Sequence, residues 1–581
     1  METKVNGFSV VEVDNPFKEL PFQKIRKFQR DFIENVDKFN VLFLSAPTGA
    51  GKTLCFEYLC NKNSPVLLVY PTNALMADQE RQLSSHGVSS FILDSDSLGD
   101  IRGYARSREL MAFFQKYDVI ITNPDILSAI LHHVYVNPEE DMLRVFSYFH
   151  YIIYDEFHVY RELELSDLLL QLTLFLNFSK SKVILSSATP SFEFINVLQD
   201  TVPNCKTKII EEKGTEKGVM IRHDTKTCLT NEKFKASVNA IIESCIEKNL
   251  RTLVICNSNK FARELYNLLV SKGYDEFVTK DTGDETRGTT KADLTKPVII
   301  STSKSEIGVN YPLDAIIMDV APDLQSFIQR FGRISRQKEG SAFIFVKTLF
   351  GLGQQIDYLK FIETIRDYFL ERKLSERTLR FLLEFRANLV LASYSKHFDL
   401  LARAFSAINW RKYHALFKDL DEAKKKILDC GVVSNREVDS LMGFLEDYEA
   451  GLSFLRGQSV SAKIKYLRGE DWTFTSYNLL HSLNNYEVAI GSDYIELLAP
   501  SESNMVHSLI YNKVPYDFYK FTEQIRQEIL EKWRRIENLG LVNRNHRWLL
   551  QELLSIDLKR VIIPEIVMLK DGTKVTLANY L

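Results

Sequence analysis

The sequence predicts an α/β protein with two tandem parallel sheets flanked by helices, followed by a mostly helical C-terminal region with a small β portion. Apolar runs of strand length recur up to about residue 350, and amphipathic stretches separate them, which is the pattern of β-α units. The runs are mostly apolar at every position, as in strands buried on both faces. Beyond residue 350 helical periodicity dominates.

The apolar runs fall into two sets joined by a charged, glycine-bearing segment. The first set is expected at 41–45, 66–70, 119–122, 151–154 and 183–186, and the second at 252–257, 297–301, 315–319 and 342–347. Segment 211–217 between them is the expected linker. The predicted domains are therefore 1–210, 211–350 and 351–581.

The C-terminal region is predicted to be mainly helical. Helices are expected over 355–372, 375–393, 422–429, 436–454 and 516–538, and strands within 462–476 and 561–577. Asp571-Gly572 predicts a hairpin turn in the second β segment. The aromatic residues of this region either fill a core, which we favour, or stack on bases: Trp472, Phe474, Tyr477 and Tyr486.

Composition limits the class of protein. Hydrophobic residues make up 45% of the 581 residues, and no apolar run approaches the roughly 18–20 residues of a membrane helix. The N-terminus lacks a secretory signal, and seven cysteines without a Cys-x-x-Cys pair fit a reducing compartment, so a cytoplasmic protein is expected. A net charge of −3 excludes a globally basic nucleic-acid binder, so phosphates would be held locally by amides and hydroxyls.

A glycine-bearing loop joins the first apolar run to an expected helix. Such a loop lets backbone N–H groups converge on phosphate oxygens, and Gly49 and Gly51 permit the close approach because they lack Cβ. Lys52 is suited to the β- and γ-phosphates and the Thr53 hydroxyl to Mg²⁺. The expected ATP-binding residues of the loop are Thr48, Gly49, Ala50, Gly51, Lys52 and Thr53.

An acidic pair follows the apolar run at 151–154, where a second element must lie to meet the Mg²⁺. Asp155 is expected to hold the metal through water, and Glu156 to orient and polarise the attacking water. Upstream of the loop, Gln29 is a candidate reader of the adenine edge, with a helix-surface glutamine as the alternative.

Segment 329–336 supplies arginines from the second set of strands. Arg333 and Arg336 are candidate arginine fingers, because a guanidinium is a permanently charged fork suited to developing γ-phosphate charge. Gln329 is expected to bridge the γ-phosphate or the water to His158. For Arg330 we favour a structural ion pair.

These motifs, together with Asp155-Glu156-Phe157-His158 and Ser187-Ala188-Thr189, resemble superfamily 2 helicases of the DExH type over residues 20–350. That family is built from two RecA-like lobes. Within it, the acidic motif and segments 186–190 and 303–310 look most like the helicase subunit of type I CRISPR systems. Asn310 departs from the aspartate that many relatives carry.

The resemblance implies ATP- and Mg²⁺-dependent 3′-to-5′ movement on single-stranded DNA, after recruitment by an RNA-guided effector complex. No HD nuclease domain fits before the phosphate loop, and His223-Asp224 is expected to be a strand-end pair. The resemblance therefore points to the nuclease-free subunit of type I-D, whose partner would be the HD-nuclease-bearing large subunit. The C-terminal region is expected to cover the DNA channel or to bind that complex.

The same resemblance implies a nucleic-acid track at the strand ends of both lobes. Its expected residues are Pro71, Thr72, Asn73, Thr122, Asn123, Asn257, Ser258, Ser301 and Thr302. His158, Ser187 and Thr189 are expected to couple nucleotide state to this track. Two alternatives stay open, a DExH helicase that acts on RNA or in DNA repair, and an ATP-dependent clamp without processive unwinding.

Overall fold

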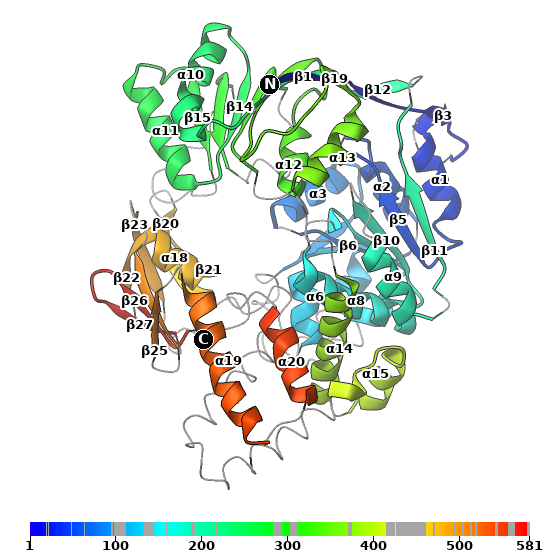
Figure 1. Cartoon of the computed structure of the whole chain (residues 1–581). Helices are drawn as coiled ribbons and strands as arrows, with labels where there is room; N and C mark the ends of the chain where they lie inside the picture. The colour runs from blue at the N-terminus through cyan, green and yellow to red at the C-terminus, as the bar shows by residue number, and fades with distance from the viewer. Residues whose placement is uncertain are drawn as a thin grey trace.

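The computed structural model in Figure 1 describes most of the chain. The parts it does not describe are 95–96, 98–111, 133–144, 158–159, 188–191, 216–217, 283–292, 303–311, 322–323, 370–374, 414–424, 426–451, 453–460, 469–470, 492–493, 502–504, 512–513, 518–519, 541–543, 556–563, 578–581 and residues 19, 21, 48, 63, 72, 204, 294 and 395. Among the described residues, no helix combines the length and the apolar content needed to cross a bilayer.

The first lobe is a parallel sheet with helices on both faces. Its strand order is β11-β5-β10-β9-β6-β8-β7, and all neighbouring strands are parallel. The strands are β5 (Val41–Ser45), β6 (Val66–Val69), β7 (Ser90–Leu93), β8 (Val119–Thr122), β9 (Tyr151–Tyr154), β10 (Lys182–Ser187) and β11 (Thr207–Glu211). All five predicted strands are present, because a strand that is buried on both faces is apolar throughout.

Side chains that alternate along β5 enter two separate cores. Leu42 and Leu44 face the core formed with α1 (Lys27–Asn35), α2 (Thr53–Cys60) and α3 (Asn73–Ser85). Val41 and Phe43 face the core formed with α6 (Pro124–Leu131), α8 (Glu162–Phe178) and α9 (Phe192–Thr201). This two-sided burial holds the carboxyl ends of the strands along one edge of the sheet.

The second lobe is an eight-stranded sheet of order β15-β16-β14-β17-β18-β13-β1-β19. The four predicted strands are present as β14 (Thr252–Ile255), β16 (Val298–Ser301), β17 (Ala315–Met318) and β18 (Gly340–Phe345). The other members are β1 (Glu2–Val5), β13 (Thr225–Thr230), β15 (Val278–Asp281) and β19 (Gln355–Ile356). Helices α10 (Phe234–Glu247) and α11 (Asn259–Ser271) cover one face, and α12 (Leu324–Phe331) and α13 (Tyr358–Tyr368) the other.

The N-terminal segment belongs to the second lobe before it reaches the first, so the predicted boundaries 1–210 and 351–581 do not follow the sheets. β1 pairs with β13 and β19, and α13 packs in the second-lobe core. Short strands at residues 2–5 and 355–356 carry no pattern that assigns them to a sheet far away in sequence. Figure 1 shows the N-terminal strand crossing from the second sheet towards α1.

Two chain segments therefore cross between the lobes, side by side. One is the N-terminal segment, in which β2 (Phe8–Val10) pairs with β12 (Val219–Arg222) and β3 (Glu12–Asp14) pairs with β4 (Lys24–Arg26). The other is the predicted linker, whose Thr215 N–H donates to Ser9 O at 2.9 Å. A Cβ at Gly218 would lie 2.3 Å from Val10 O, so glycine is needed where the two crossings touch.

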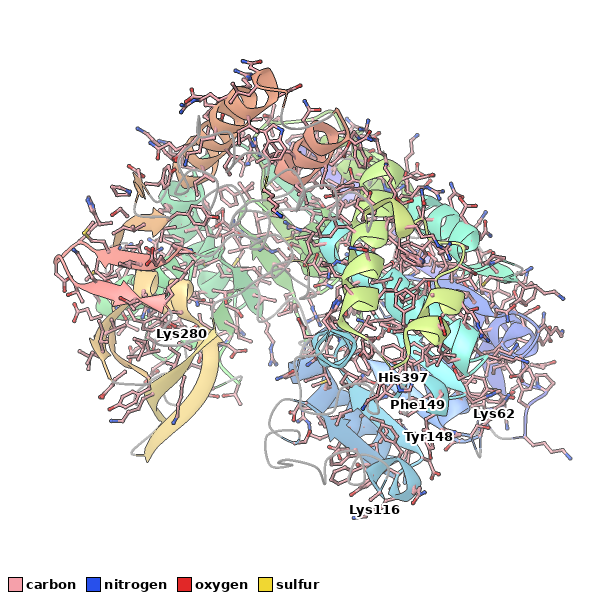
Figure 2. The ribbon with its side chains drawn as sticks, turned by 90° about the horizontal axis from the view of Figure 1, so that it is seen from below. Lys62, Lys116, Tyr148, Phe149, Lys280 and His397 are labelled. Atoms are coloured by element: carbon pink, nitrogen blue, oxygen red, sulfur yellow. The ribbon has the colours of Figure 1, made fainter. Side chains whose placement is uncertain are left out.

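The C-terminal region joins the first lobe through α14 (Glu376–Ser393) and α15 (Phe398–Ala404), which pack into the core of α8 and α9. Figure 2 shows these helices on the side of Tyr148 and Phe149, with Lys280 on the other side of the view. Two four-stranded sheets follow, β21-β20-β23-β22 and β25-β24-β26-β27. They share one core with α19 (Phe521–Asn538) and α20 (Arg544–Ser555), and Tyr486 is buried in it.

The remaining elements complete this region. They are α18 (Leu479–Asn485), β20 (Ser461–Arg468), β21 (Asp471–Asn478), β22 (Tyr486–Ile490), β23 (Ile495–Pro500), β24 (Val506–Tyr511), β25 (Val514–Asp517), β26 (Ile566–Leu569) and β27 (Lys574–Thr576). The predicted hairpin at Asp571-Gly572 is confirmed as the β26–β27 turn. The helices expected at 422–429 and 436–454 fall on segments that are almost entirely outside the described residues, as do the side chains of Trp472, Phe474 and Tyr477.

Candidate functional site

The candidate site lies at the carboxyl edge of the first sheet, where three adjacent strands end. The order β5-β10-β9 places the loop after β5, Ser187 at the end of β10 and Asp155 after β9 next to one another. Ser187 O accepts the N–H of Ala46 at 3.3 Å, which ties β10 to the start of the loop. Parallel strands lie roughly 4.8 Å apart, so about 10 Å separates the loop strand from the acidic strand.

The phosphate loop has the conformation that its glycines were expected to allow. Gly49 and Gly51 have φ of 83° and 81°, in the region that residues with a Cβ rarely adopt. A Cβ at Gly51 would lie 2.7 Å from the guanidinium of Arg26, so side chains close in on the loop here. Lys52 precedes α2, and Thr53 is its first residue.

Arg26 and Gln29 hold the loop from outside. Arg26 Nη1 donates to Gly49 O at 3.2 Å, and Gln29 Nε2 donates to Gly51 O at 2.8 Å. Gln29 Oε1 accepts the N–H of Arg26 at 2.8 Å. The predicted adenine reader is thus buried beside the loop, with both amide atoms bonded to the protein. Arg26 had no predicted role, although it belongs to the same segment, 26–29, from which Gln29 was predicted.

The acidic pair and Lys52 form the charged centre. Lys52 Nζ lies 3.6 Å from Glu156 Oε1 and donates to Ala46 O at 3.4 Å. Glu156 has φ of 50°, a left-handed conformation that costs a residue with a Cβ about 1–2 kcal/mol. Non-glycine residues held in this way cluster at functional sites.

Asp155 is the least satisfied carboxylate of this centre. Its Oδ1 is buried and accepts no hydrogen bond from the described residues. Burial, and then the neighbouring Glu156, raise the pKa of Asp155 to about 6, although Lys52 acts in the opposite direction. A buried carboxylate oxygen beside a phosphate loop fits a hard cation such as Mg²⁺, which takes oxygen ligands from carboxylates and phosphates.

The second lobe contributes segment 329–336 at the end of α12. Arg330 donates to the backbone carbonyl of Asp319 at 3.1 Å and to the amide oxygen Oδ1 of Asn257 at 2.9 Å, and the structural ion pair favoured for it stays a prediction. Arg336 Nε donates to Gly332 O at 2.8 Å. Burial lowers the pKa of Arg336, and the charges of Tyr358 and Glu156 act against that shift. Arg336 therefore lies within electrostatic range of Glu156 across the two lobes. Gln329 and Arg333 are also buried in this segment.

The polar residues of the predicted nucleic-acid track have varied surroundings. The buried Thr122 hydroxyl donates to Leu93 O at 2.7 Å, and the buried Ser301 hydroxyl donates to Asp281 O at 2.6 Å. Asn257 donates its Nδ2–H to Val320 O at 2.6 Å and accepts from Arg330. These side chains already have protein partners, so the expected phosphate contact by the Thr122 and Ser301 hydroxyls needs correction. A hydroxyl at the end of a fully buried strand bonds a neighbouring carbonyl because no water reaches it.

Among the described residues of the track, Asn73, Asn257 and Ser258 are exposed, whereas Asn123 is buried. Asn123 Nδ2 donates to Asn73 Oδ1 at 3.1 Å, so the structure brings these two predicted residues together. Asn123 also caps α6, and Ser258 caps α11. Asn73 is solvent-exposed, whereas Pro71 and Thr302 are buried. The predictions for Thr48, Thr72, His158, Thr189 and Asn310 lie outside the described residues.

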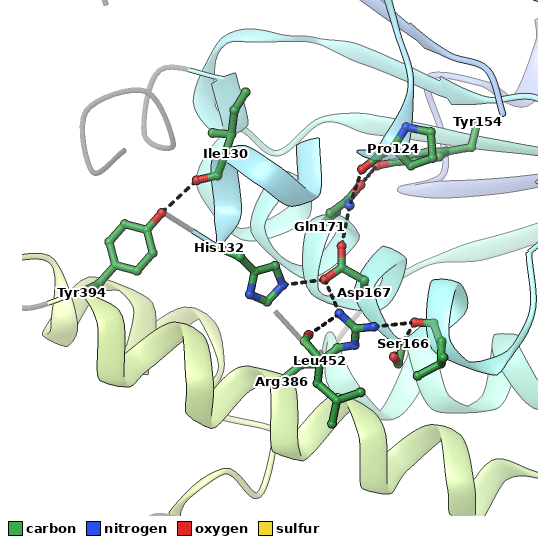
Figure 3. A network of polar contacts seen from close by, with 11 residues as sticks. Pro124, Ile130, His132, Tyr154, Ser166, Asp167, Gln171, Arg386, Tyr394 and Leu452 are labelled. Carbon is green, nitrogen blue, oxygen red and sulfur yellow. Dashed lines mark hydrogen bonds and ion pairs between the residues drawn. The ribbon is translucent and has the colours of Figure 1, made fainter. Parts of the chain in front are cut away.

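A buried polar cluster, which the sequence did not reveal, lies behind the acidic strand (Figure 3). We call it the α8–α14 joint: Asp167 and Gln171 of α8, His132, and Arg386 of α14. Asp167 Oδ1 lies 2.6 Å from His132 Nε2 and accepts from Arg386 Nη1 at 3.1 Å. Burial alone would raise the pKa of Asp167, but His132, Arg386 and Gln171 outweigh it and hold the pKa at about 2.

The α8–α14 joint reaches the site through one side chain. Tyr154, the last residue of β9, donates its hydroxyl to Gln171 Oε1 at 2.8 Å, and Gln171 Nε2 donates to Asp167 Oδ2 at 2.8 Å. Arg386 also donates to Leu452 O at 2.6 Å. The residue before Asp155 is therefore linked by hydrogen bonds to the C-terminal region (Figure 3).

Comparison with known proteins agrees with this geometry. Residues 26–197 match the family model of the DEAD/DEAH box helicase. The ATP-dependent helicase YprA of Bacillus subtilis, described as uncharacterized, is 23% identical over 364 residues, which is 56% of this chain and 47% of YprA. The helicase MJ1574 of Methanocaldococcus jannaschii, described in the same way, is 24% identical over 346 residues, 53% of this chain and 47% of MJ1574. The chain spans about half the length of these curated relatives.

Among solved structures, the DUF1998 helicase MrfA bound to DNA and AMPPNP is similar, with a TM-score of 0.54 and 15% identity, covering 87% of this chain and 75% of that chain. MrfA bound to DNA alone gives a TM-score of 0.53 at the same identity. At this identity the likeness shows the fold. Residues 26–197 are therefore similar to a DEAD/DEAH box helicase domain, and the chain has the fold of two RecA-like lobes.

Proposed function

We propose that the protein hydrolyses ATP between its two lobes and uses the cycle to move along single-stranded DNA. One observation carries this proposal: Lys52, Asp155 and Glu156 meet at one sheet edge, and Arg336 of the other lobe lies within electrostatic range of Glu156. Charge from both lobes at one point is what a hydrolysis step controlled by lobe closure requires.

Each residue then has a defined task. The glycine loop and Lys52 bind and neutralise the phosphates, and Asp155 with Thr53 would hold Mg²⁺, which supplies charge neutralisation at the phosphoryl group when bound. Glu156 orients the attacking water and accepts its proton. Arg336, with Arg333, stabilises the charge that develops on the phosphoryl oxygens. Because Lys52 contacts Glu156, nucleotide binding must draw Lys52 towards the phosphates and release Glu156 for water.

The nucleic-acid contact is proposed near the exposed Asn73, which is bonded to the buried Asn123, with backbone amides rather than the Thr122 and Ser301 hydroxyls as donors. MrfA bound to DNA and AMPPNP supports DNA as the polymer. RNA is the alternative that the test must separate, because a protein distinguishes the two polymers mainly through the 2′-OH.

The test is steady-state ATP hydrolysis with and without single-stranded DNA or RNA of the same sequence. DNA is expected to stimulate hydrolysis more than RNA. Lys52→Ala should lose nucleotide binding, whereas Glu156→Gln should keep binding and lose hydrolysis. Glu363→Gln, on the exposed face of α13, is the matched control. Normal turnover by Glu156→Gln contradicts the proposed role, and DNA binding without stimulated hydrolysis favours a clamp.

A role in CRISPR interference is the finer proposal, and it rests on the acidic motif and segments 186–190 and 303–310. The named relatives are described as helicases, so they support a helicase function, and the CRISPR role rests on the motifs alone. A pull-down of the purified protein with a reconstituted type I-D effector complex on an R-loop tests this proposal. Binding to bare fork DNA that the effector complex does not increase would favour a separate DNA-repair helicase.

A further inference from the structure

The arginine segment of the second lobe rests on a strand end that the proposed mechanism does not use. Arg222 is the last residue of β12, and its guanidinium is buried behind α12. Nη2 donates to the carbonyl of Phe331, the last residue of α12, at 2.8 Å. The last carbonyls of a helix lack partners within it and carry partial negative charge, so a buried cation there fixes the helix end.

Two aromatic rings hold the guanidinium in place. Its Cζ lies 4.5 Å from the centre of the Phe331 ring and 4.8 Å from that of Tyr358. The two rings are nearly parallel, at 12° and 6.5 Å apart. A desolvated guanidinium against aromatic faces is held more rigidly than a solvated one, because it has both electrostatic attraction and little room to rotate.

The three residues that follow Arg222 form hydrogen bonds with Ser335 in the arginine segment. His223 N–H donates to Ser335 O at 2.7 Å, Ser335 Oγ donates to Asp224 O at 3.1 Å, and Thr225 Oγ1 donates to Ser335 Oγ at 2.8 Å. Ser335 is buried and has φ of 60°, a conformation that these bonds hold. Arg336 is the next residue after Ser335, so its position depends on these hydrogen bonds.

We propose that Arg222 is a positioning residue for ATP hydrolysis, which acts by fixing the end of α12 and the turn behind it so that Arg336 faces Glu156. This inference rests on the proposed function. Burial lowers the pKa of Arg222 to about 10, and the charge of Arg336 acts in the same direction. The Phe331 carbonyl and the two rings stabilise the buried Arg222 guanidinium.

The test is a double-mutant cycle on the full chain. Arg222→Met should lower kcat about 10- to 100-fold, because a small misplacement of a catalytic group is sufficient for a loss of that size, with little change in KM for ATP. In an Arg336→Ala background the same substitution should change kcat by less than about two-fold. Arg222→Lys keeps the charge but loses the planar fork, so it should fall between wild type and Arg222→Met.

Val238→Ala, in the other core of the same lobe, is the stability control and should lower the melting temperature without changing kcat. If Arg222→Met does not fold, the cycle is run with Arg222→Lys. Equal losses in both backgrounds, or a lower melting temperature with unchanged kcat, overturn the positioning role. Failure of the wild-type protein to hydrolyse ATP overturns the proposed function and this inference with it, so the two failures are distinguishable.

Discussion

The carboxyl edge of the first sheet and the α8–α14 joint each bury an aspartate, and their surroundings differ in kind. Asp155 has one buried oxygen with no hydrogen bond from the described residues and a pKa raised to about 6. Asp167 has His132, Gln171 and Arg386 around it and a pKa of about 2. The charge of Asp155 is only partly compensated, whereas the charge of Asp167 is compensated and links α8 to α14.

The largest effect is expected at Arg336, which completes the first of these regions from the other lobe. Arg336→Ala should lower kcat for ATP hydrolysis on the order of 10³-fold or more, because the arginine stabilises charge only in the transition state. Binding of a fluorescent ATP analogue should be nearly unchanged. Arg366→Ala, on the exposed face of α13, is the control and should behave as wild type. Equal loss of binding and hydrolysis would show that Arg336 acts in the ground state.

Asp155→Asn should separate activity from stability. Hydrolysis should fall on the order of 10²-fold, since a charged metal ligand is lost. The free energy of unfolding at pH 7.5 should rise by about 1–3 kcal/mol, because a buried charge with poor compensation is removed. Urea denaturation and steady-state kinetics give the two quantities, with the exposed Asp118→Asn as control. A less stable variant would contradict the comparison between the two aspartates.

Arg386→Met should lower the stability of the protein and leave the nucleotide site intact. It leaves Asp167 buried with one partner fewer, and breaking a buried pair costs about 3–5 kcal/mol. The folded fraction should retain its nucleotide affinity. Arg380→Met, on the same helix, removes a partly exposed pair with Asp200 and should cost less than about 1 kcal/mol. Similar losses for the two variants would show that the joint contributes no more than a surface pair.

The two aspartates should also give opposite dependences of stability on pH. The folded pKa of Asp155 lies above its ordinary value of about 3.9, so its contribution is present below that value and is lost as pH rises through about 6. The folded pKa of Asp167 lies below that value, so its contribution is present above it and is lost as pH falls through about 2. Each should amount to about 2–3 kcal/mol.

Urea midpoints measured from pH 3 to 8 test this. Asp155→Asn should remove the loss of stability between about pH 4 and 6, whereas Arg386→Met should weaken the dependence below about pH 4. Addition of Mg²⁺ to wild type should stabilise more at pH 7.5 than at pH 5, because the ion competes with the proton on Asp155. A midpoint that is independent of Mg²⁺ at both pH values would contradict the metal role.

The sequence predicted both sheets and the position of the phosphate loop for a local reason. A strand that is buried on both faces must be apolar throughout, as at 151–154, and Gly49 and Gly51 are required by the turn they make. Partners far apart in sequence were not predictable. Arg386 meets Asp167, β1 pairs with β13, and Arg222 bonds Phe331 only after the chain has folded. The Thr122 hydroxyl was misread because its partner, Leu93 O, belongs to a neighbouring strand.

The paired crossings between the lobes have a mechanical consequence. A single tether would let the second lobe rotate about any axis and also slide past the first. Two antiparallel segments joined by β2–β12 pairing and by the bond from Thr215 to Ser9 resist sliding and twisting, and leave one easy rotation. Under the proposed function, closure and opening of the lobes would then follow the same path in every cycle.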